Sequence, residues 1–448
     1  MRVLILGAGP AGLGAAHRLH ELGHDDWLLL EASDGPGGLA SSVADDKGFT
    51  WDHGVHVLHS HYAEFDRVMD SIVGVPVDGK PFEWLEARRS AWAWIDGGYG
   101  GRFVGYPVQE NFWALDDVDV ARCLEGLYSR DARLLTLTFE EWIYASFGAG
   151  LADIFMLPYN RKVWGCEPAE MNKTWVGDRV SQIDMLKIIG NRHKTGDSGW
   201  GPNATFRYPA RGGTGAIWKA VASGLPKEKI QYGYRADTWS LKHKSVHATN
   251  AQETSGDAFF YDVVISTLPL DRLSDLFVDG VDYIPSAPRL RYQTTHVVGL
   301  GFKGCPTADL SGKSWIYFPG GEPFYRMTVL SRFSENMAPV GHWSVLFEVG
   351  DREARARAGA VQGSIDAFKA LGWTNGSELV STHYRRLERG YPVPTLDRDE
   401  ILGEVQPRLK EMGIVSVGRF GGWKYEESNQ DHSWMAGVKA VDQILEKS

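Results

Sequence analysis

The chain has 448 residues, a formal net charge of −10 and 43% hydrophobic residues. This length predicts two or three domains, and the composition is that of an ordinary globular protein. The acidic balance argues against nucleic acid as a partner, and no apolar run approaches the roughly 20 residues of a membrane-spanning helix. The only cysteines, Cys123, Cys166 and Cys305, lie far apart. We therefore expect no disulfide framework and a reducing, cytoplasmic location.

The first residues predict a nucleotide-binding unit. Residues 2–6 are typical of a buried parallel strand rather than a signal peptide. They run directly into Gly7, Gly9 and Gly12 of a GxGxxG pattern, and a helical stretch follows. Gly7 permits the tight turn, Gly9 lets a pyrophosphate approach the backbone, and Gly12 lets helix and strand pack closely. A second predicted strand ends at Glu31, which is placed to bind ribose hydroxyls.

Two further features favour FAD over NAD as the dinucleotide. Gly37 and Gly38 resemble the second glycine motif of FAD-dependent oxidoreductases, and residues 261–269 read as a strand that returns to the same sheet. The sequence holds no second GxGxxG, so one FAD is the economical interpretation. The closing stretch, residues 418–445, places polar residues before a predicted helix whose free N–H groups are expected to face the flavin. We expect Ser433 to cap this helix.

Longer stretches resemble the UDP-galactopyranose mutases of the eukaryotic type. They are FMLPYNRKVWGCEPAEMNKTWVGDRV (155–180), GPNATFRYPARGGTGAIW (201–218), SWIYFP and PFYR within 314–326, RGYPVPTL (389–396) and the closing stretch. These matches follow one order along nearly the whole chain. The resemblance implies a fold of the α/β class, with a Rossmann-type FAD-binding domain that is discontinuous in sequence.

The implied division of the chain has three parts. The FAD-binding domain takes residues 1–86, 204–282 and 412–448, an inserted helical substrate domain takes 110–203, and a mostly antiparallel sheet domain takes 87–109 and 283–411. The local patterns agree with this division. Residues 138–195 show helical periodicity, residues 291–303 and 343–349 alternate as strands do, and residues 351–371 read as a helix.

The resemblance also implies an isomerisation without net oxidation. Family members interconvert the pyranose and furanose forms of a nucleoside-diphosphate hexose, most often UDP-galactose. Reduced FAD is required, because its N5 attacks the anomeric carbon and forms a flavin–sugar adduct while the diphosphate leaves. The implied partners are a nucleotide sugar and an electron donor such as NAD(P)H. The sequence does not fix the oligomeric state.

Site residues follow from the same resemblance. Arg179 and Arg326 match the two diphosphate-binding arginines, whose planar groups can each make two parallel hydrogen bonds, and His56 matches the histidine that approaches the flavin. The substrate-binding residues implied are Tyr106, Val108, Gln109, Phe155, Tyr159, Asn160, Trp164, Asn203, Trp315, Tyr317, Tyr391 and Tyr425. The cofactor-binding residues implied are Gly7, Gly9, Gly12, Glu31, Gly37, Gly38, Arg419, Gln430 and Ser433.

The histidine loop, residues 51–62, invites a metal interpretation. No nearby cysteine or pair of acids completes a ligand set in the sequence, so we expect no metal. We expect His53, His59 and His61 to be structural or exposed.

Two departures from the family pattern concern the nucleotide. Val108 stands where a phenylalanine is usual, and Leu157 replaces an arginine. Both changes remove bulk from the predicted base pocket, so a GDP-hexose such as GDP-L-galactose is an alternative to UDP-galactose. An amine-oxidase-like FAD oxidoreductase and a non-catalytic flavin-binding or nucleotide-sugar-binding protein are alternatives of other classes. The paired arginines favour the mutase, since an amine pocket has no use for two cations.

Overall fold

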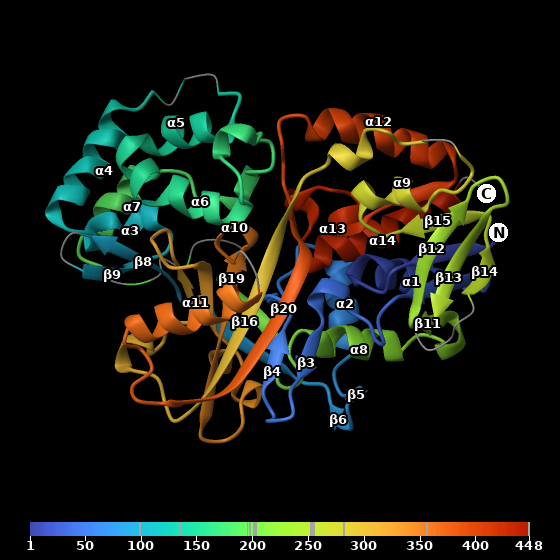
Figure 1. Cartoon of the computed structure of the whole chain (residues 1–448), viewed down its shortest axis with the longest axis horizontal. Coiled ribbons are helices and arrows are strands. Elements are labelled where there is room, and N and C mark those ends of the chain that lie inside the picture. Colours follow the sequence, from blue (N-terminus) through green and yellow to red (C-terminus); the bar gives the residue numbers. More distant parts are fainter. Residues whose placement is uncertain are drawn as a thin grey trace.

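The computed structural model describes residues 1–97, 100–131, 133, 136–194, 196, 199, 204–250, 256–280, 283–354 and 357–446. The chain forms a parallel sheet, a large mixed sheet and a cluster of helices (Figure 1). This arrangement confirms the predicted α/β class. None of the helices in these ranges is both long and apolar enough to cross a membrane.

The parallel sheet has five strands in the order β11-β2-β1-β15-β21. Its strands are β1 (Val3–Leu6), β2 (Trp27–Glu31), β11 (Ile230–Tyr232), β15 (Val263–Ser266) and β21 (Ile414–Ser416). The apolar run at the start of the chain is central in this sheet, and all four of its residues are buried. The strand predicted within residues 261–269 pairs in parallel with β1, as expected.

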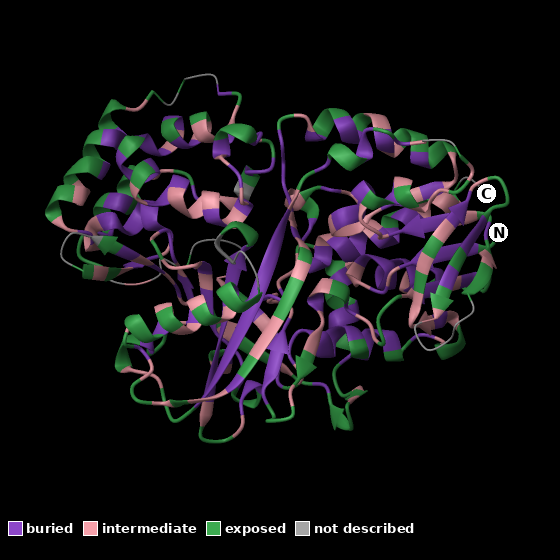
Figure 2. Ribbon diagram, viewed as in Figure 1, coloured by how far each residue is buried: buried purple, intermediate pink, exposed green. Residues whose placement is uncertain are grey.

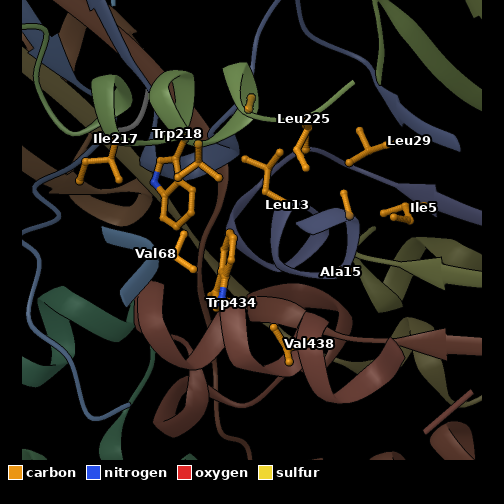
Figure 3. Close-up of a cluster of buried hydrophobic side chains, with 14 of the residues drawn as sticks. Ile5, Leu13, Ala15, Leu29, Val68, Ile217, Trp218, Leu225, Trp434 and Val438 are labelled. Carbon is orange, nitrogen blue, oxygen red and sulfur yellow. The ribbon is translucent and has the colours of Figure 1, made fainter. Parts of the chain in front are cut away.

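Helices from both ends of the chain pack together beside this sheet. Helix α1 (Pro10–Glu21) crosses α14 (Gln430–Leu445), and Figure 3 shows Leu13, Trp434 and Val438 in their shared core. A Cβ on Gly437 would lie 1.9 Å from the carbonyl oxygen of Ala11, so only glycine allows this approach. Other elements of this region are α2 (Ala63–Ser71), α8 (Gly215–Ser223), α12 (Arg398–Glu411), α13 (Gly418–Gly421), and the sheet of β12 (Tyr234–Ser240), β13 (Ser245–Asn250) and β14 (Gly256–Phe260).

The start of α14 corrects one prediction. Its N-cap is Asn429, and no side chain caps the helix. Ser433 lies one turn inside the helix, where its backbone N–H donates to the carbonyl oxygen of Asn429 at 2.9 Å. The prediction that Ser433 is the cap is therefore wrong, because the helix begins earlier than the apolar spacing indicated.

The large sheet has seven strands in the order β20-β16-β19-β18-β17-β8-β9. Its strands are β8 (Ala91–Gly97), β9 (Gly100–Gly105), β16 (Tyr292–Lys303), β17 (Trp315–Tyr317), β18 (Phe324–Val329), β19 (His342–Gly350) and β20 (Glu378–Pro392). Only the β17–β8 pair is parallel. The two strands predicted at 291–303 and 343–349 are confirmed as β16 and β19. The predicted helix over 351–371 is present as α10 (Asp351–Ala354) and α11 (Arg357–Ala370).

A group of helices lies at the upper left of Figure 1, with its own buried core. It contains α3 (Val108–Asn111), α4 (Asp117–Ser129), α5 (Phe139–Leu151), α6 (Leu157–Trp164) and α7 (Met185–Gly190). Thr138 and Glu141 form a capping box at the start of α5, which explains why the helix begins there. Figure 2 shows the buried faces of these helices turned toward one another. The predicted helical stretch is thus confirmed, while the exact domain boundaries stay a proposal.

Candidate active site

The glycine loop between β1 and α1 fits a dinucleotide. A Cβ on Gly12 would lie 1.8 Å from the carbonyl oxygen of Gly7, and a Cβ on Gly7 would lie 2.2 Å from Thr267 Oγ1. Among the described residues, by contrast, nothing outside its chain neighbours and helix backbone lies within 4 Å of a Cβ on Gly9. Gly9 is also the N-cap of α1 and carries no side-chain cap. Open space and free N–H groups therefore coincide where a pyrophosphate would bind.

Glu31 and the second glycine pair lie beside this loop. The Glu31 carboxylate accepts hydrogen bonds from the backbone N–H of Ala8 at 2.7 Å and from that of Ser33 at 2.8 Å. Gly37 and Gly38 adopt left-handed φ angles of 111° and 54°, and the Gly37 N–H donates to the carbonyl oxygen of Ala8 at 2.9 Å. A Cβ on Gly38 would face Gly9 Cα at 3.4 Å. Both motifs thus converge on the loop, as a dinucleotide site requires.

A cavity of about 610 Å³ brings together most of the predicted site residues. Its walls come from the histidine loop, the helical region, the large sheet and the segment before α14. The predicted residues that line it are His56, Tyr106, Gln109, Phe155, Tyr159, Asn160, Trp164, Arg179, Trp315, Tyr317, Arg326, Tyr391, Arg419, Tyr425 and Gln430. Residues far apart in the sequence therefore share one chamber.

Val108, and with it Leu157, does not behave as predicted. Both side chains are buried in the core of the helical region, and neither is among the described residues that line the cavity. Val108, in the short helix α3, belongs to the same buried cluster as Phe112 and is fully buried. The prediction that Val108 forms a wall of the base pocket is therefore wrong.

One other predicted residue in the described part of the chain lies apart from this chamber. Ser433 is buried in the first turn of α14 and is not among the described lining residues. Asn203 lies outside the described residues. The predicted contacts of these two residues with ligands remain proposals.

Arg326 is held by a buried carboxylate that sequence reasoning missed. Its Nε donates to Glu348 Oε1 at 3.0 Å, and its Nη2 donates to the same oxygen. Glu348 also accepts from the Tyr325 hydroxyl at 2.9 Å and from the Val55 N–H at 3.4 Å. Burial alone would lower the pKa of Arg326, but the charge of Glu348 raises that pKa well above its usual value. Arg326 is therefore a fixed cation, and one acid joins it to the histidine loop.

Arg179 and Arg419 complete a positively charged wall. Arg179 donates to the carbonyl oxygen of Glu426 and to Asn429 Oδ1, and its guanidinium lies 4.9 Å from the centre of the Tyr425 ring. The Arg419 guanidinium lies 4.9 Å from the centre of the Tyr391 ring. The charged Arg and Glu residues that line the cavity in the described part of the chain are Arg89, Arg179, Arg326, Arg419, Glu348 and Glu426. The balance of four cations to two anions suits a ligand that carries more than one negative charge.

Aromatic rings line a further part of the cavity. Phe155 and Tyr159 stack with their ring centres 5.2 Å apart and planes within 7°, and Tyr317 packs edge-on against Tyr159 at 5.5 Å. Burial raises the pKa of Tyr391 to about 12 and that of Tyr159 well above its usual value. These phenols are therefore protonated at neutral pH and can donate hydrogen bonds to phosphate oxygens.

His56 is a neutral imidazole with a defined tautomer. Its Nδ1 lies 3.0 Å from the carbonyl oxygen of Gly54, which can only accept, so Nδ1 carries the proton and Nε2 is left as an acceptor. Burial and then the charge of Arg419 lower the pKa of His56 to about 4. The side chain can thus accept a hydrogen bond inside the cavity without adding a further positive charge.

The other histidines of the loop are partly as predicted. His53 Nδ1 bonds to Ser41 Oγ at 2.8 Å, and His61 Nδ1 bonds to Asp431 Oδ2 at 2.8 Å. However, His53, His59 and His61 also line the cavity. The fold brings one acid, Asp431, and His432 beside His61 with ligating atoms within 4.8 Å of one another, a group that the sequence did not reveal. The absence of a metal stays a prediction. The His61–Asp431 hydrogen bond ties the loop to α14, whereas the His432–Asp431 contact lies within α14.

Comparison with solved structures identifies the family. A crystal structure of reduced UDP-galactopyranose mutase matches 100% of this chain and 94% of its own, with 41% sequence identity and a TM-score of 0.91. The chain belongs to the UDP-galactopyranose mutase family. The broader family model of flavin containing amine oxidoreductases matches residues 10–419. FAD is thus the cofactor of the family, and the glycine loop fits it.

More distant relatives share only part of this likeness. Cyclohexylamine oxidase from Brevibacterium oxydans is 13% identical with a TM-score of 0.69, over 100% of this chain and 99% of its own, which shows the fold alone. The mitochondrial protoporphyrinogen oxidase of Nicotiana tabacum is 21% identical over 63% of each chain. The chain therefore spans less than two thirds of the length of that curated relative. The mutase likeness, in contrast, covers the whole cavity.

The neutral state of His56 gives a testable pH dependence. Its pKa is about 4 in the folded protein and 6.5 when unfolded, so the unfolded state binds more protons between these values. The stabilisation is full above pH 6.5 and is lost as the pH falls toward 4, by on the order of 2 kcal/mol for one partly exposed group. Urea unfolding at pH 7.5 and pH 5 should show a smaller loss for His56→Asn than for the natural chain. The exposed His20→Asn is the control, and an equal loss in all three would contradict the assignment.

Proposed function

We propose that the chain is a flavin-dependent mutase that interconverts the pyranose and furanose forms of a UDP-hexose, with UDP-galactose as the preferred sugar nucleotide. The observation that carries this proposal is the cavity itself, in which fixed arginines face protonated tyrosines. A nucleoside diphosphate provides the two negative charges and the planar base that such walls complement. Membership of the UDP-galactopyranose mutase family supports the same reaction.

Each wall of the cavity has a task in this reaction. Arg179 and Arg326 bind the diphosphate and stabilise the negative charge that it gains as the anomeric bond breaks. The phenols of Tyr317, Tyr391 and Tyr425 donate further hydrogen bonds to phosphate oxygens. The stacked rings beside α6 hold the base, and the depth of the cavity keeps the sugar away from bulk water. Reduced FAD, when bound, supplies the electron pair that attacks the anomeric carbon and ends the cycle unchanged.

His56 and Glu348 align the flavin side with the diphosphate side. Glu348 fixes Arg326 and also accepts from the N–H of Val55, the residue before His56. The position of the diphosphate cation and that of the flavin-facing histidine therefore depend on one carboxylate. The neutral His56 Nε2 can accept a hydrogen bond from the reduced cofactor. Because His56 is uncharged, this bond does not depend on the charge of the cofactor.

Amine oxidation is the weaker functional alternative. An amine substrate is a cation at neutral pH, and the lining of this cavity carries an excess of arginines. The distant amine oxidases share the fold at 13% identity, which says nothing of substrate.

An electron donor such as NAD(P)H is still needed to reduce the flavin, and we propose that the enzyme acts in the cytoplasm.

The test of the proposed function is a product assay. Reduced holoenzyme is incubated with a panel of UDP-hexoses and GDP-hexoses, oxidised holoenzyme is incubated with primary amines in the presence of oxygen, and the products are resolved by chromatography. We expect a furanose isomer from UDP-galactose. Oxidation of an amine without any sugar isomerisation would overturn the proposal.

The nucleotide base can be tested by competition. Since Val108 and Leu157 pack in the helical core, their size does not enlarge the base pocket, and we expect UDP to bind reduced enzyme at least about tenfold, or about 1.4 kcal/mol, tighter than GDP under identical salt. Val108→Phe should overpack the core by about 1–3 kcal/mol and leave base preference unchanged. Tighter binding of GDP would restore the GDP-hexose alternative.

A further inference from the structure

Arg398 is an almost fully buried cation outside the main cavity. It begins α12, is 1% exposed, and is not among the described residues that line the main cavity. Its Nη1 and Nη2 donate to the two carboxylate oxygens of Glu426 at 3.0 and 2.9 Å, in a bidentate pair. Its Nε donates to Asp399 at 2.8 Å. Such a fork fixes both the distance and the orientation of its partner.

Glu426 turns its other side toward the main cavity. Its backbone carbonyl accepts the hydrogen bond of Arg179 Nη2. Its neighbour Tyr425 supplies the ring on which Arg179 lies. Both residues belong to the short helix η12 (Tyr425–Glu427). The side chain of Glu426 is thus an anchor, and its main chain is a support for Arg179.

The same arginine also reaches the segment that carries Arg179. Arg398 Nη2 donates to Thr174 Oγ1 at 3.1 Å. Thr174 in turn donates to Asn172 Oδ1 at 2.7 Å, and the Asn172 side chain donates to the carbonyl oxygen of Thr395 at 2.8 Å. The guanidinium of Arg398 therefore joins the helical region to η12, on the side of the cavity where Arg179 lies.

Stability alone is a weak explanation for this arrangement. A buried ion pair loses hydration on both partners, and well-packed apolar residues often stabilise a protein as much. What the fork provides is a fixed geometry. We propose that Arg398 is a positioning residue, which holds Arg179 in its diphosphate-binding place through Glu426 and Thr174. This inference rests on the proposed role of Arg179 in binding the diphosphate.

A double-mutant cycle separates positioning from general stability. UDP affinity and kcat/KM are measured for reduced holoenzyme carrying Arg398→Met, Arg179→Ala, or both. We expect Arg398→Met to weaken UDP binding about tenfold, and to have little further effect once Arg179 is alanine, because its target is then absent. Arg398→Lys keeps the charge but not the fork, so it should recover only part of the affinity. Arg18→Met is the matched control, since Arg18 also pairs with two carboxylates, Glu21 and Asp442, away from the cavity.

Folding of the variants is checked by flavin content and thermal unfolding. If Arg398→Met does not fold, the cycle is run with Arg398→Met combined with Glu426→Gln, which removes the carboxylate of the fork and leaves only the exposed Asp399 without its arginine. Unchanged UDP affinity in the folded variant, or fully additive effects with Arg179→Ala, would overturn the positioning role while leaving the proposed function intact. Normal affinity in Arg179→Ala alone would instead overturn the role of Arg179, and the inference with it.

Discussion

Reduced enzyme should isomerise UDP-galactose, whereas oxidised enzyme should bind the same substrate and leave it unchanged. The cavity can hold the diphosphate in either state, because Arg179 and Arg326 are fixed by Glu426, Asn429 and Glu348 rather than by the cofactor. Only the reduced flavin has an electron pair to give to the anomeric carbon. The expected effect is loss of all measurable turnover.

The comparison uses one preparation assayed before and after dithionite. Binding of UDP to both forms is measured in parallel, so that lost affinity cannot mimic lost chemistry. Cyanoborohydride added during turnover should leave sugar mass on the flavin extracted from the reduced enzyme. Equal turnover by the two redox forms would contradict the nucleophilic role of the flavin.

Replacing either diphosphate arginine should give the second-largest effect. Arg326→Ala and Arg179→Ala each remove a charge-assisted pair, which costs roughly 2–4 kcal/mol, or about 30- to 1,000-fold in kcat/KM. Arg326→Ala should be the more harmful, because it also leaves Glu348 buried without its cation. Arg326→Lys keeps the charge but loses the pair of hydrogen bonds that the guanidinium makes. Its kcat/KM should therefore lie between that of the natural chain and that of Arg326→Ala.

Kinetics of the reduced enzyme provide the measurement. Arg122→Ala is the control, since Arg122 lies in an exposed pair with Asp119 on α4 of the same helical region. UDP affinity should fall together with kcat/KM in the cavity variants and stay unchanged in the control. Near-normal kinetics for Arg179→Ala and Arg326→Ala would show that the diphosphate binds elsewhere.

The nucleotide-binding half of the fold was predictable from local patterns. A buried strand, the spacing of Gly7, Gly9 and Gly12, and the acid at Glu31 each follow from contacts within about 30 residues. The strands β16 and β19 were also predictable, although nearly all of their residues are buried and do not alternate between buried and exposed. The patterns that predict these elements are local, so the sequence alone was sufficient for this part of the fold.

The residues that support the site were not predictable in this way. Glu348 interrupts the apolar run of β19, and that interruption was the one signal of its role, but its partner Arg326 comes from another strand. Asp431 meets His61 across 370 positions, which no local pattern reveals. The prediction for Val108 was wrong for a different reason. The position of a residue in a motif does not say which way a short helix turns its side chain. Sequence thus indicates which groups a site contains, and packing decides which of them face it.

The central claim is that the chain isomerises a nucleotide sugar without net oxidation. The most direct measurement counts furanose product per flavin after reduced holoenzyme is freed of excess reductant and kept without oxygen. We predict that each flavin converts many equivalents of UDP-galactopyranose to UDP-galactofuranose and is still reduced at the end. Product that stops at one equivalent per flavin, or flavin that becomes oxidised in step with the sugar, would contradict the claim.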